Sequence, residues 1–249
     1  MACVVSINNM SARCNECRLS ADCPLLDDAP ASTDTPGHSR LRVLHAGDRL
    51  FRAADRVDAM YRVRSGVVKT SLTGQDGVEQ VTGFYGAGEW VGLDALDGEH
   101  YRSEAVALET ASVCVIPYRV LRERMSNSSH AARLMVEAMS RRLATKEGIH
   151  LSLARDNAAQ RLAAFLLDLS QRRGAAGLDA THIALPMSRG EIASYLALAV
   201  ETVSRLFTRL HRAGIVQVHR NHVEVKDHAS LARSAGHLGI DAPLRASGH

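Results

Sequence analysis

Residues 188–210 read SRGEIASYLALAVETVSRLFTRL, and their pattern predicts the fold of the C-terminal part of the chain. Ser188 and Glu191 have the spacing of a capping box, in which two side chains pair with free N–H groups at a helix start. The apolar face of a second helix follows, with a residue every three or four positions: Val203, Leu206, Phe207 and Leu210. The pattern therefore predicts two helices, 188–198 and 200–213, joined by a tight turn.

A β-hairpin, 215–218 and 222–225, is predicted directly after the second helix. Two short helices and a hairpin are the elements of a winged helix-turn-helix, which inserts the exposed face of its second helix into the major groove of DNA. That face carries the predicted base-reading residues: Glu201, Ser204 and Arg205. Arginine can donate two hydrogen bonds to guanine, and a carboxylate can accept one from a base amino group. The alternative is that Glu201 and Arg205 form only a surface ion pair.

Contacts to DNA phosphates are predicted for hydroxyl and basic residues around this face: Ser188, Arg189, Thr202, Arg209 and Arg220. Residues 151–249 contain 12 Arg and Lys against 8 Asp and Glu. A basic excess in the part of the chain that holds these residues fits a polyanionic partner.

Residues 41–125 differ from the C-terminal part in glycine content and in the length of their apolar runs. Half of the chain's 18 glycines lie between Gly47 and Gly98, where they separate short β-favouring runs. Such spacing is typical of an antiparallel sandwich or barrel. Within this region, residues 73–78 have the composition of a hairpin turn.

The composition of the whole chain is that of an ordinary globular protein. Of its 249 residues, 46% are hydrophobic, and the formal net charge is +3, which excludes disorder as the main state. No run approaches the ~18 apolar residues of a membrane span. The first residues also lack the basic region and the apolar stretch of a secretory signal. We therefore expect a cytoplasmic protein.

A long helix is predicted over about 126–153, because this stretch lacks proline and is rich in Ala, Met, Leu, Arg and Glu. Residues at spacings of three and four form a seam along it, apolar at the ends and polar in the middle: Met135, Met139, Leu143, Lys146 and His150. A long helix with one such stripe usually pairs with a partner helix, which predicts a homodimer. The alternative is that the stripe packs on the β domain of the same chain.

Four of the five cysteines lie within the first 23 residues, and the fifth, Cys114, stands far from them. In a reducing compartment, clustered cysteines indicate metal or redox ligands before disulfides. Four thiolates suit either a [4Fe–4S] cluster or an all-cysteine zinc site, and the candidates are Cys14, Cys17, Cys23 and Cys114. In a further alternative, Cys114 is only a small buried apolar residue in a strand.

The segments SRGEIASYL at 188–196 and VETVSRL at 200–206 closely resemble the helix-turn-helix of the Crp/FNR regulator superfamily. Four segments extend the resemblance upstream and point to the FNR branch: VTGF at 81–84, ALET at 107–110, CVIP at 114–117 and RLAAF at 161–165. The resemblance runs from Cys14 to about Lys226. The sequence departs from the family in the turn, where Ala197 and Ala199 replace the usual Gly and Ser or Thr. The second helix thereby loses a side-chain cap worth about 1 kcal/mol.

This resemblance implies an α+β fold. Its parts are an antiparallel β-roll sensor domain of the cyclic-nucleotide-binding type, a long dimerisation helix and a C-terminal winged helix-turn-helix. The expected divisions of the chain are a Cys-rich segment with a linker at 1–40, the β-roll at 41–125, the dimerisation helix at 126–156, the DNA-binding domain at 157–233 and a flexible tail at 234–249.

The resemblance also implies a function, that of an oxygen-sensing transcription regulator. The residues that match the [4Fe–4S] ligands of the FNR-type proteins are Cys14, Cys17, Cys23 and Cys114. The cluster-bound dimer is expected to bind palindromic DNA of the TTGAT…ATCAA kind without oxygen, to activate or repress transcription, and to be switched off when oxygen destroys the cluster. Arg18, directly after Cys17, is expected to tune the rate of cluster loss. The expected contact with RNA polymerase is the loop of Gly74, Asp76 and Gly77.

The middle of the helix seam departs from the family pattern. Similar proteins have a charged, usually acidic, residue there that opposes dimerisation without the cluster, and Lys146 takes its place here. His150 stands where an aliphatic residue is expected. Two Lys146 side chains facing across a two-fold axis would still repel each other. Alternatively, Lys146 pairs with Glu147 of the partner subunit and the dimer is permanent.

Two other kinds of regulator in the same family remain as alternatives, one stabilised by zinc and one responsive to a cyclic nucleotide. Arg102 and Ser103 match the phosphate-binding pair of the cyclic-nucleotide branch, but the position of its ribose-binding glutamate reads Gly92-Leu93-Asp94. The ribose would therefore lack an acceptor in register, and we expect Arg102 on a surface loop. An enzyme is not expected, because the sequence contains no nucleophile–base motif and no phosphate loop.

Overall fold

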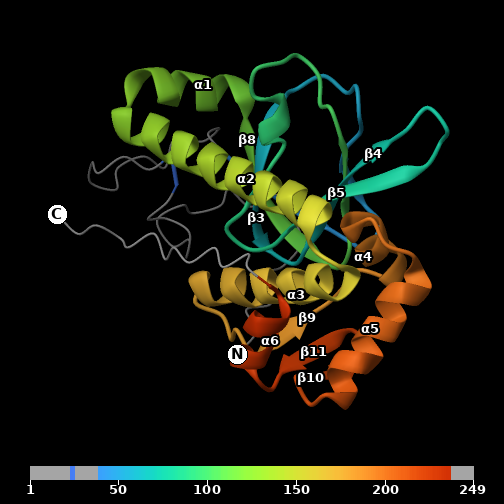
Figure 1. The fold of residues 1–249 in the computed structure, drawn as a ribbon. Helices are drawn as coiled ribbons and strands as arrows, with labels where there is room; N and C mark the ends of the chain where they lie inside the picture. Colours follow the sequence, from blue (N-terminus) through green and yellow to red (C-terminus); the bar gives the residue numbers. More distant parts are fainter. Residues whose placement is uncertain (1–22, 26–38, 237–249) are drawn as a thin grey trace. The chain divides into compact units, whose positions relative to one another are not determined.

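The computed structural model describes residues 23–25 and 39–236 of the chain. It divides into two compact units, Met1–Ala144 and Thr145–His249, and the division falls inside the long helix α2, Ser129–Arg155. Each unit has its own buried residues, and Figure 1 shows the helices and strands of both.

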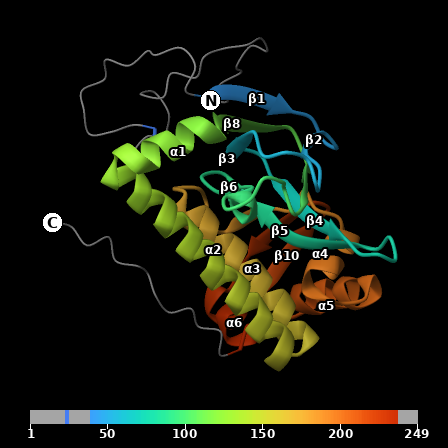
Figure 2. The ribbon, with the colours of Figure 1, turned by 90° about the horizontal axis from the view of Figure 1, so that it is seen from above.

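Two four-stranded antiparallel sheets make up the β part of the first unit, as far as its described residues go (Figure 2). One sheet has the order β1-β8-β3-β6 and the other β2-β7-β4-β5. The strands are β1 (Arg40–Leu44), β2 (Arg49–Phe51), β3 (Ala59–Ser65), β4 (Val68–Thr73), β5 (Glu79–Tyr85), β6 (Trp90–Val91), β7 (Glu104–Ala107) and β8 (Ala111–Pro117). A short 3-10 turn, η3 (Leu93–Ala95), follows β6. The predicted antiparallel β-roll is confirmed.

The strand β3 is buried on both faces from Ala59 to Val63, and all of these residues except Arg62 are apolar or aromatic. Tyr61 and Val63 face the core between the two sheets, whereas Met60 faces a second apolar cluster. That second cluster also contains Leu121 and Met135 from the helices that cover the β1-β8-β3-β6 sheet. The sheet is therefore the middle layer of the unit.

The hairpin β4–β5 extends away from the rest of the first unit (Figures 1 and 2). Its strands pair from Val68 opposite Tyr85 to Thr73 opposite Glu79. In the turn, Gly77 has a φ of 77°, a conformation that favours glycine. The turn predicted at residues 73–78 is therefore confirmed.

The predicted long helix corresponds to α2, and a further helix, α1 (Tyr118–Asn127), lies directly before it. The sequence pattern missed α1, which begins directly after β8. The break falls at Ser128, whose φ of −132° and ψ of 117° are extended. Its hydroxyl accepts a hydrogen bond from the Ala131 N–H at 3.1 Å. This is an N-cap contact, so Ser128 ends one helix and starts the next.

The second unit contains several packed helices and a small sheet. Its elements after α2 are α3 (Ala158–Ala175), β9 (His182–Ala184), α4 (Arg189–Leu196), α5 (Val200–Arg212), β10 (Val216–His219), β11 (His222–Val225) and α6 (His228–Ser234). The sheet has the order β10-β11-β9 and is antiparallel. Asn157 and Gln160 form a capping box at the start of α3. The winged helix-turn-helix is confirmed.

The expected flexible tail at 234–249 begins too early. Ser234 still belongs to α6, which packs against α3, and Ala235 is 1% exposed. The sequence analysis missed α6 because it is a single short helix, seven residues long. Residues 237–249 lie outside the described part of the chain, as do 1–22 and 26–38. No described helix is long and apolar enough to cross a membrane.

Candidate DNA interface and cysteine site

The two helices of the helix-turn-helix are joined as the sequence predicts. The Ser188 hydroxyl accepts from the Glu191 N–H at 3.1 Å, and the Glu191 carboxylate accepts from the Ser188 N–H at 2.7 Å. Ala197 ends α4 with a φ of 50°, a left-handed conformation that glycine adopts at lower cost. Ala199 is the N-cap of α5 and provides no side-chain hydrogen bond. The predicted loss of a cap is therefore confirmed.

The helix α5 has one buried and one exposed face. Its buried residues are Val203, Leu206, Phe207 and Leu210. The proposed base-reading residues, Glu201, Ser204 and Arg205, are all exposed. The structure records no ion pair between Glu201 and Arg205, both of which lie in its described part. The Ser204 hydroxyl donates to the Val200 carbonyl at 3.0 Å, so it can offer DNA only its acceptor lone pairs in this rotamer.

The proposed phosphate-binding residues have different environments. Arg209 and Arg220 are exposed, and Thr202 is half-buried. The Ser188 hydroxyl already caps α4. Arg189 is half-buried, with its guanidinium 3.5 Å from the centre of the Phe207 ring, and burial lowers the pKa of this residue. The structure thus gives Arg189 a packing role between α4 and α5.

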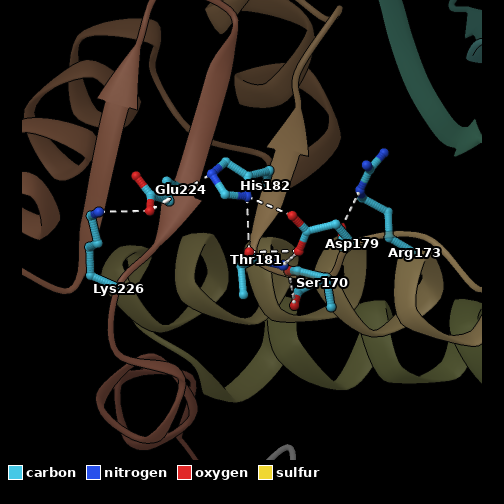
Figure 3. Close-up of polar contacts among 8 residues, drawn as sticks. Ser170, Arg173, Asp179, Thr181, His182, Glu224 and Lys226 are labelled. Atoms are coloured by element: carbon cyan, nitrogen blue, oxygen red, sulfur yellow. Dashed lines mark hydrogen bonds and ion pairs between the residues drawn. The ribbon is translucent and has the colours of Figure 1, made fainter. Parts of the chain in front are cut away.

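A polar cluster that the sequence analysis did not find fastens β11 to β9 (Figure 3). His182 lies opposite Glu224 in the strand register, and its Nδ1 is 2.6 Å from a carboxylate oxygen of Asp179. Lys226 Nζ is 2.6 Å from Glu224. Hydrogen bonds from the side chain and backbone N–H of Thr181, and then from His182, lower the pKa of Asp179. Cross-strand register, which sequence spacing does not reveal, brings these charges together.

The two described cysteines of the proposed ligand set lie on one apolar cluster. Cys114 is on β8, opposite Leu41 of β1 and Arg62 of β3. Cys23 and Cys114 are both partly buried against the cluster that contains Leu25 and Met60. Two distant parts of the chain therefore bring their thiols to the same region of the first unit, an arrangement that fits ligands of one shared group. Cys14, Cys17 and Arg18 lie outside the described residues.

The seam predicted on α2 changes at its first residue. Met135 is fully buried in the same apolar cluster as Cys114, because it faces the β sheet. The face of α2 that begins instead with Val136 has residues at alternating spacings of three and four: Val136, Met139, Leu143, Lys146, His150 and Leu153. Val136 is 55% exposed and Leu143 is 59% exposed. This is a heptad pattern, which is typical of a helix that pairs with another helix.

The residues that match a cyclic-nucleotide site are engaged within the chain. Arg102 is on the surface and forms an ion pair with Asp97 at 3.1 Å. Ser103 is 3% exposed, and its hydroxyl donates to the Asp94 carboxylate at 3.2 Å. The expectation that Arg102 lies on a surface loop is confirmed.

The loop expected to contact RNA polymerase is the tip of the β4–β5 hairpin. Gly74, Asp76 and Gly77 are all exposed. The Asp76 carboxylate accepts from the Val78 N–H at 3.1 Å and so stabilises the turn. Val78 itself is 61% exposed, which leaves an apolar side chain beside this loop open to contact.

Two protein-family profiles match the chain. One, described as a Crp-like helix-turn-helix domain, matches residues 160–234. The other, described as a cyclic nucleotide-binding domain, matches residues 41–128. The two profiles thus fall on the winged helix-turn-helix and on the β-roll with α1.

Curated relatives resemble most of the chain. It is 40% identical over 229 residues to the transcriptional activator protein FnrA of Stutzerimonas stutzeri, covering 90% of this chain and 93% of FnrA. It is 37% identical over 198 residues to the fumarate and nitrate reduction regulatory protein of Escherichia coli strain K12, covering 80% of this chain and 79% of that protein. Among solved structures, FixK2 from Bradyrhizobium japonicum matches with a TM-score of 0.72 and 27% identity, over 78% of this chain and 96% of FixK2.

Proposed function

The chain belongs to the Crp/FNR family of DNA-binding transcription regulators, which are not enzymes, and we propose that it is an oxygen-responsive member of the family. In this proposal a [4Fe–4S] cluster is held by Cys14, Cys17, Cys23 and Cys114. The observation that carries the proposal is the position of Cys23 and Cys114 on one apolar cluster of the first unit. The FNR-type names of the relatives support it.

The four thiolates would connect the N-terminal segment to β8. A [4Fe–4S] cluster supplies an oxygen-labile cross-link when it is bound there. Cys114 is on the strand that leads into α1. The apolar side chains against which it packs include Leu121 of α1 and Met135 of α2. A change at Cys114 therefore reaches the buried face of α2 through contacts within the first unit.

The proposed response is DNA binding in the cytoplasm without oxygen. Two copies would pair through the heptad face of α2 that begins at Val136, and two α5 helices would then read a palindrome of the TTGAT…ATCAA kind with Glu201, Ser204 and Arg205. The exposed tip of the β4–β5 hairpin would contact RNA polymerase. Its Val78 gives an apolar surface for such a contact.

The experiment that tests the proposal is the metal content of the full chain purified without oxygen. We expect about four irons and four sulfides per chain, with visible absorbance that bleaches in air, and DNA binding that is lost with it. Cys114→Ala should abolish the absorbance. Cys3→Ala is the matched control, because Cys3 lies outside the proposed ligand set, and it should leave the absorbance unchanged.

Two outcomes would contradict the proposal. One zinc per chain without visible absorbance would make the cysteines a structural zinc site. DNA binding that depends on an added cyclic nucleotide, in protein without iron, would assign the input to the β-roll instead.

A further inference from the structure

Arg142 of α2 makes a close contact with strand β5. The side of α2 that faces the β part carries small and apolar residues, Ala131, Met135 and Ala138, all of them buried. Arg142 follows on the same side, one helical turn after Ala138. Its Nη2 donates a hydrogen bond to the Thr82 carbonyl of β5 at 3.1 Å, and its guanidinium lies 4.6 Å from the centre of the Tyr85 ring. Arg142 thus combines a hydrogen bond with a cation–π contact.

The contact lies directly against the backbone of Gly83. A Cβ atom on Gly83 would lie 2.6 Å from Arg142 Nη2 and 3.0 Å from Cε2 of Tyr85. The backbone of Gly83 is not left-handed, so its conformation alone does not demand glycine. A Cβ at this position would instead displace the guanidinium, the mobile end of a flexible side chain, and press on the Tyr85 ring. Gly83, Tyr85 and Arg142 therefore form one fitted unit, which we call the Arg142 clamp.

The clamp reaches both strands of the hairpin. Tyr85 is 7% exposed, and its hydroxyl accepts from Thr70 Oγ1 of β4 at 3.4 Å. Thr70 Oγ1 is also 2.9 Å from Thr82 Oγ1 of β5. Burial raises the pKa of Tyr85, and the charge of Arg142 opposes that rise. The hairpin that these strands form ends at the exposed turn with Gly77.

Leu143, which directly follows Arg142 in α2, is 59% exposed and belongs to the heptad face. Neighbouring side chains on a helix are fixed relative to each other, so a rotation or shift of α2 on pairing at Leu143 must also move Arg142. We infer that the Arg142 clamp transmits the pairing of α2 to the β4–β5 hairpin, with Arg142 as the positioning residue. The inference rests on the proposed dimerisation through α2.

Hydrogen exchange in the full chain, purified without oxygen, tests the inference. Amide protection of residues 79–85 is compared between dilute protein and protein bound to a palindromic DNA duplex, and sedimentation reports the oligomeric state of both. In the wild-type protein we expect pairing to slow this exchange about tenfold. Arg142→Gln should remove that response while dimerisation on DNA persists.

Two further variants separate coupling from a general loss of structure. Arg141→Gln changes the neighbouring arginine, which is exposed and whose Nη1 lies 3.9 Å from Oε2 of Glu137. This variant should keep the wild-type response. Gly83→Ala should displace the guanidinium and reproduce the effect of Arg142→Gln. The double variant Gly83→Ala with Arg142→Gln should be no worse than either single variant, because both remove the same contact.

The possible results have distinct meanings. If Arg142→Gln responds to pairing as the wild type does, the clamp does not transmit it and the inference is wrong. Additive effects of Gly83→Ala and Arg142→Gln would also overturn it. If the wild-type protein stays monomeric on the DNA, the dimer of the proposed function fails and the coupling fails with it. Sedimentation identifies that case separately.

Discussion

Arg205 shows what one exposed side chain of α5 can contribute. It lies on the face opposite Phe207 and Leu210, where a guanidinium can pair with both acceptors of a guanine edge. Arg205→Lys keeps the charge but loses the planar pair of donors. We expect it to lower discrimination against a changed guanine by about 1–3 kcal/mol, with a smaller loss of binding to unrelated DNA. Competition binding at a fixed salt concentration measures both.

Arg209→Lys is the matched control for Arg205. Arg209 is also exposed on α5 and is proposed to contact phosphate, for which a lysine charge suffices. We expect unchanged base preference for this variant. Equal losses of discrimination for the two variants would contradict the assignment of Arg205 to base reading.

Asp179 gives the β10-β11-β9 sheet a defined pH dependence. Hydrogen bonds from Thr181 and His182 lower its pKa from the ordinary value of 3.8, so the folded state favours the carboxylate. The resulting stability is present above pH 3.8 and is lost as the pH falls through the lowered pKa. Asp179→Asn should therefore speed amide exchange in residues 179–184 at pH 7, and its difference from wild type should shrink below about pH 4.

Asp97→Asn is the control for this pH effect. Asp97 is an exposed carboxylate of the first unit that pairs with the exposed Arg102. It should leave exchange in residues 179–184 unchanged at every pH. A constant difference between Asp179→Asn and wild type from pH 7 to pH 3 would show that the carboxylate charge is not the cause.

At the scale of the element, two alanines make the turn between α4 and α5 less stable than glycine and serine would at the same positions. Ala197 has a left-handed φ of 50°, and Ala199 caps α5 without a side-chain bond. Ala199→Ser should add about 1 kcal/mol to the free energy of unfolding of the second unit by accepting from a free N–H. Ala197→Gly should add up to about 1 kcal/mol by removing strain. Denaturant unfolding measures both, and a destabilised Ala199→Ser would contradict the cap geometry.

One position of the heptad face of α2 is expected to oppose pairing. Lys146 and His150 follow Leu143 on this face, and both are exposed. In a paired helix, two Lys146 side chains would approach each other and repel. We expect Lys146→Ala to raise the dimer fraction of protein without cluster about fivefold in association constant, which sedimentation measures. An unchanged or lower dimer fraction would favour the ion pair of Lys146 with Glu147 of the partner subunit.

At the scale of the whole molecule, the two faces of α2 have separate tasks. Met135 is fully buried in the first unit, whereas Val136 is 55% exposed. Met135→Ala should lower the free energy of unfolding by about 2–5 kcal/mol, because it leaves a cavity in that core. Val136→Asp should leave the fold intact and weaken dimerisation, because it places like charges in the paired face. Thermal unfolding and sedimentation, applied to both variants, distinguish the two tasks.

The reverse pattern would contradict this division of α2. If Met135→Ala weakened association and Val136→Asp unfolded the first unit, Met135 would belong to the paired face after all. Both variants change neighbouring positions of one helix, so each serves as the control for the other.

Elements whose signals are local could be predicted from the sequence. The capping box of Ser188, the apolar face of α5 and the glycine turn at 73–78 each depend on residues within one or two helical turns or one hairpin, and the structure has each of them. The absence of a side-chain cap at Ala199 could equally be predicted from the sequence. The helices α1 and α6 were missed, because each is short and carries little periodic signal of its own.

Which faces and side chains come together was set by the tertiary structure. It buried Met135 and left Val136 exposed, because the neighbouring sheet covers one side of α2, a fact that helical periodicity does not contain. It brought Cys23 to the cluster of Cys114, paired His182 with Glu224 and placed Arg142 against Gly83. Each of these contacts joins residues far apart in the chain. Their formation depends on strand register and on close packing between elements, which spacing along the sequence does not specify.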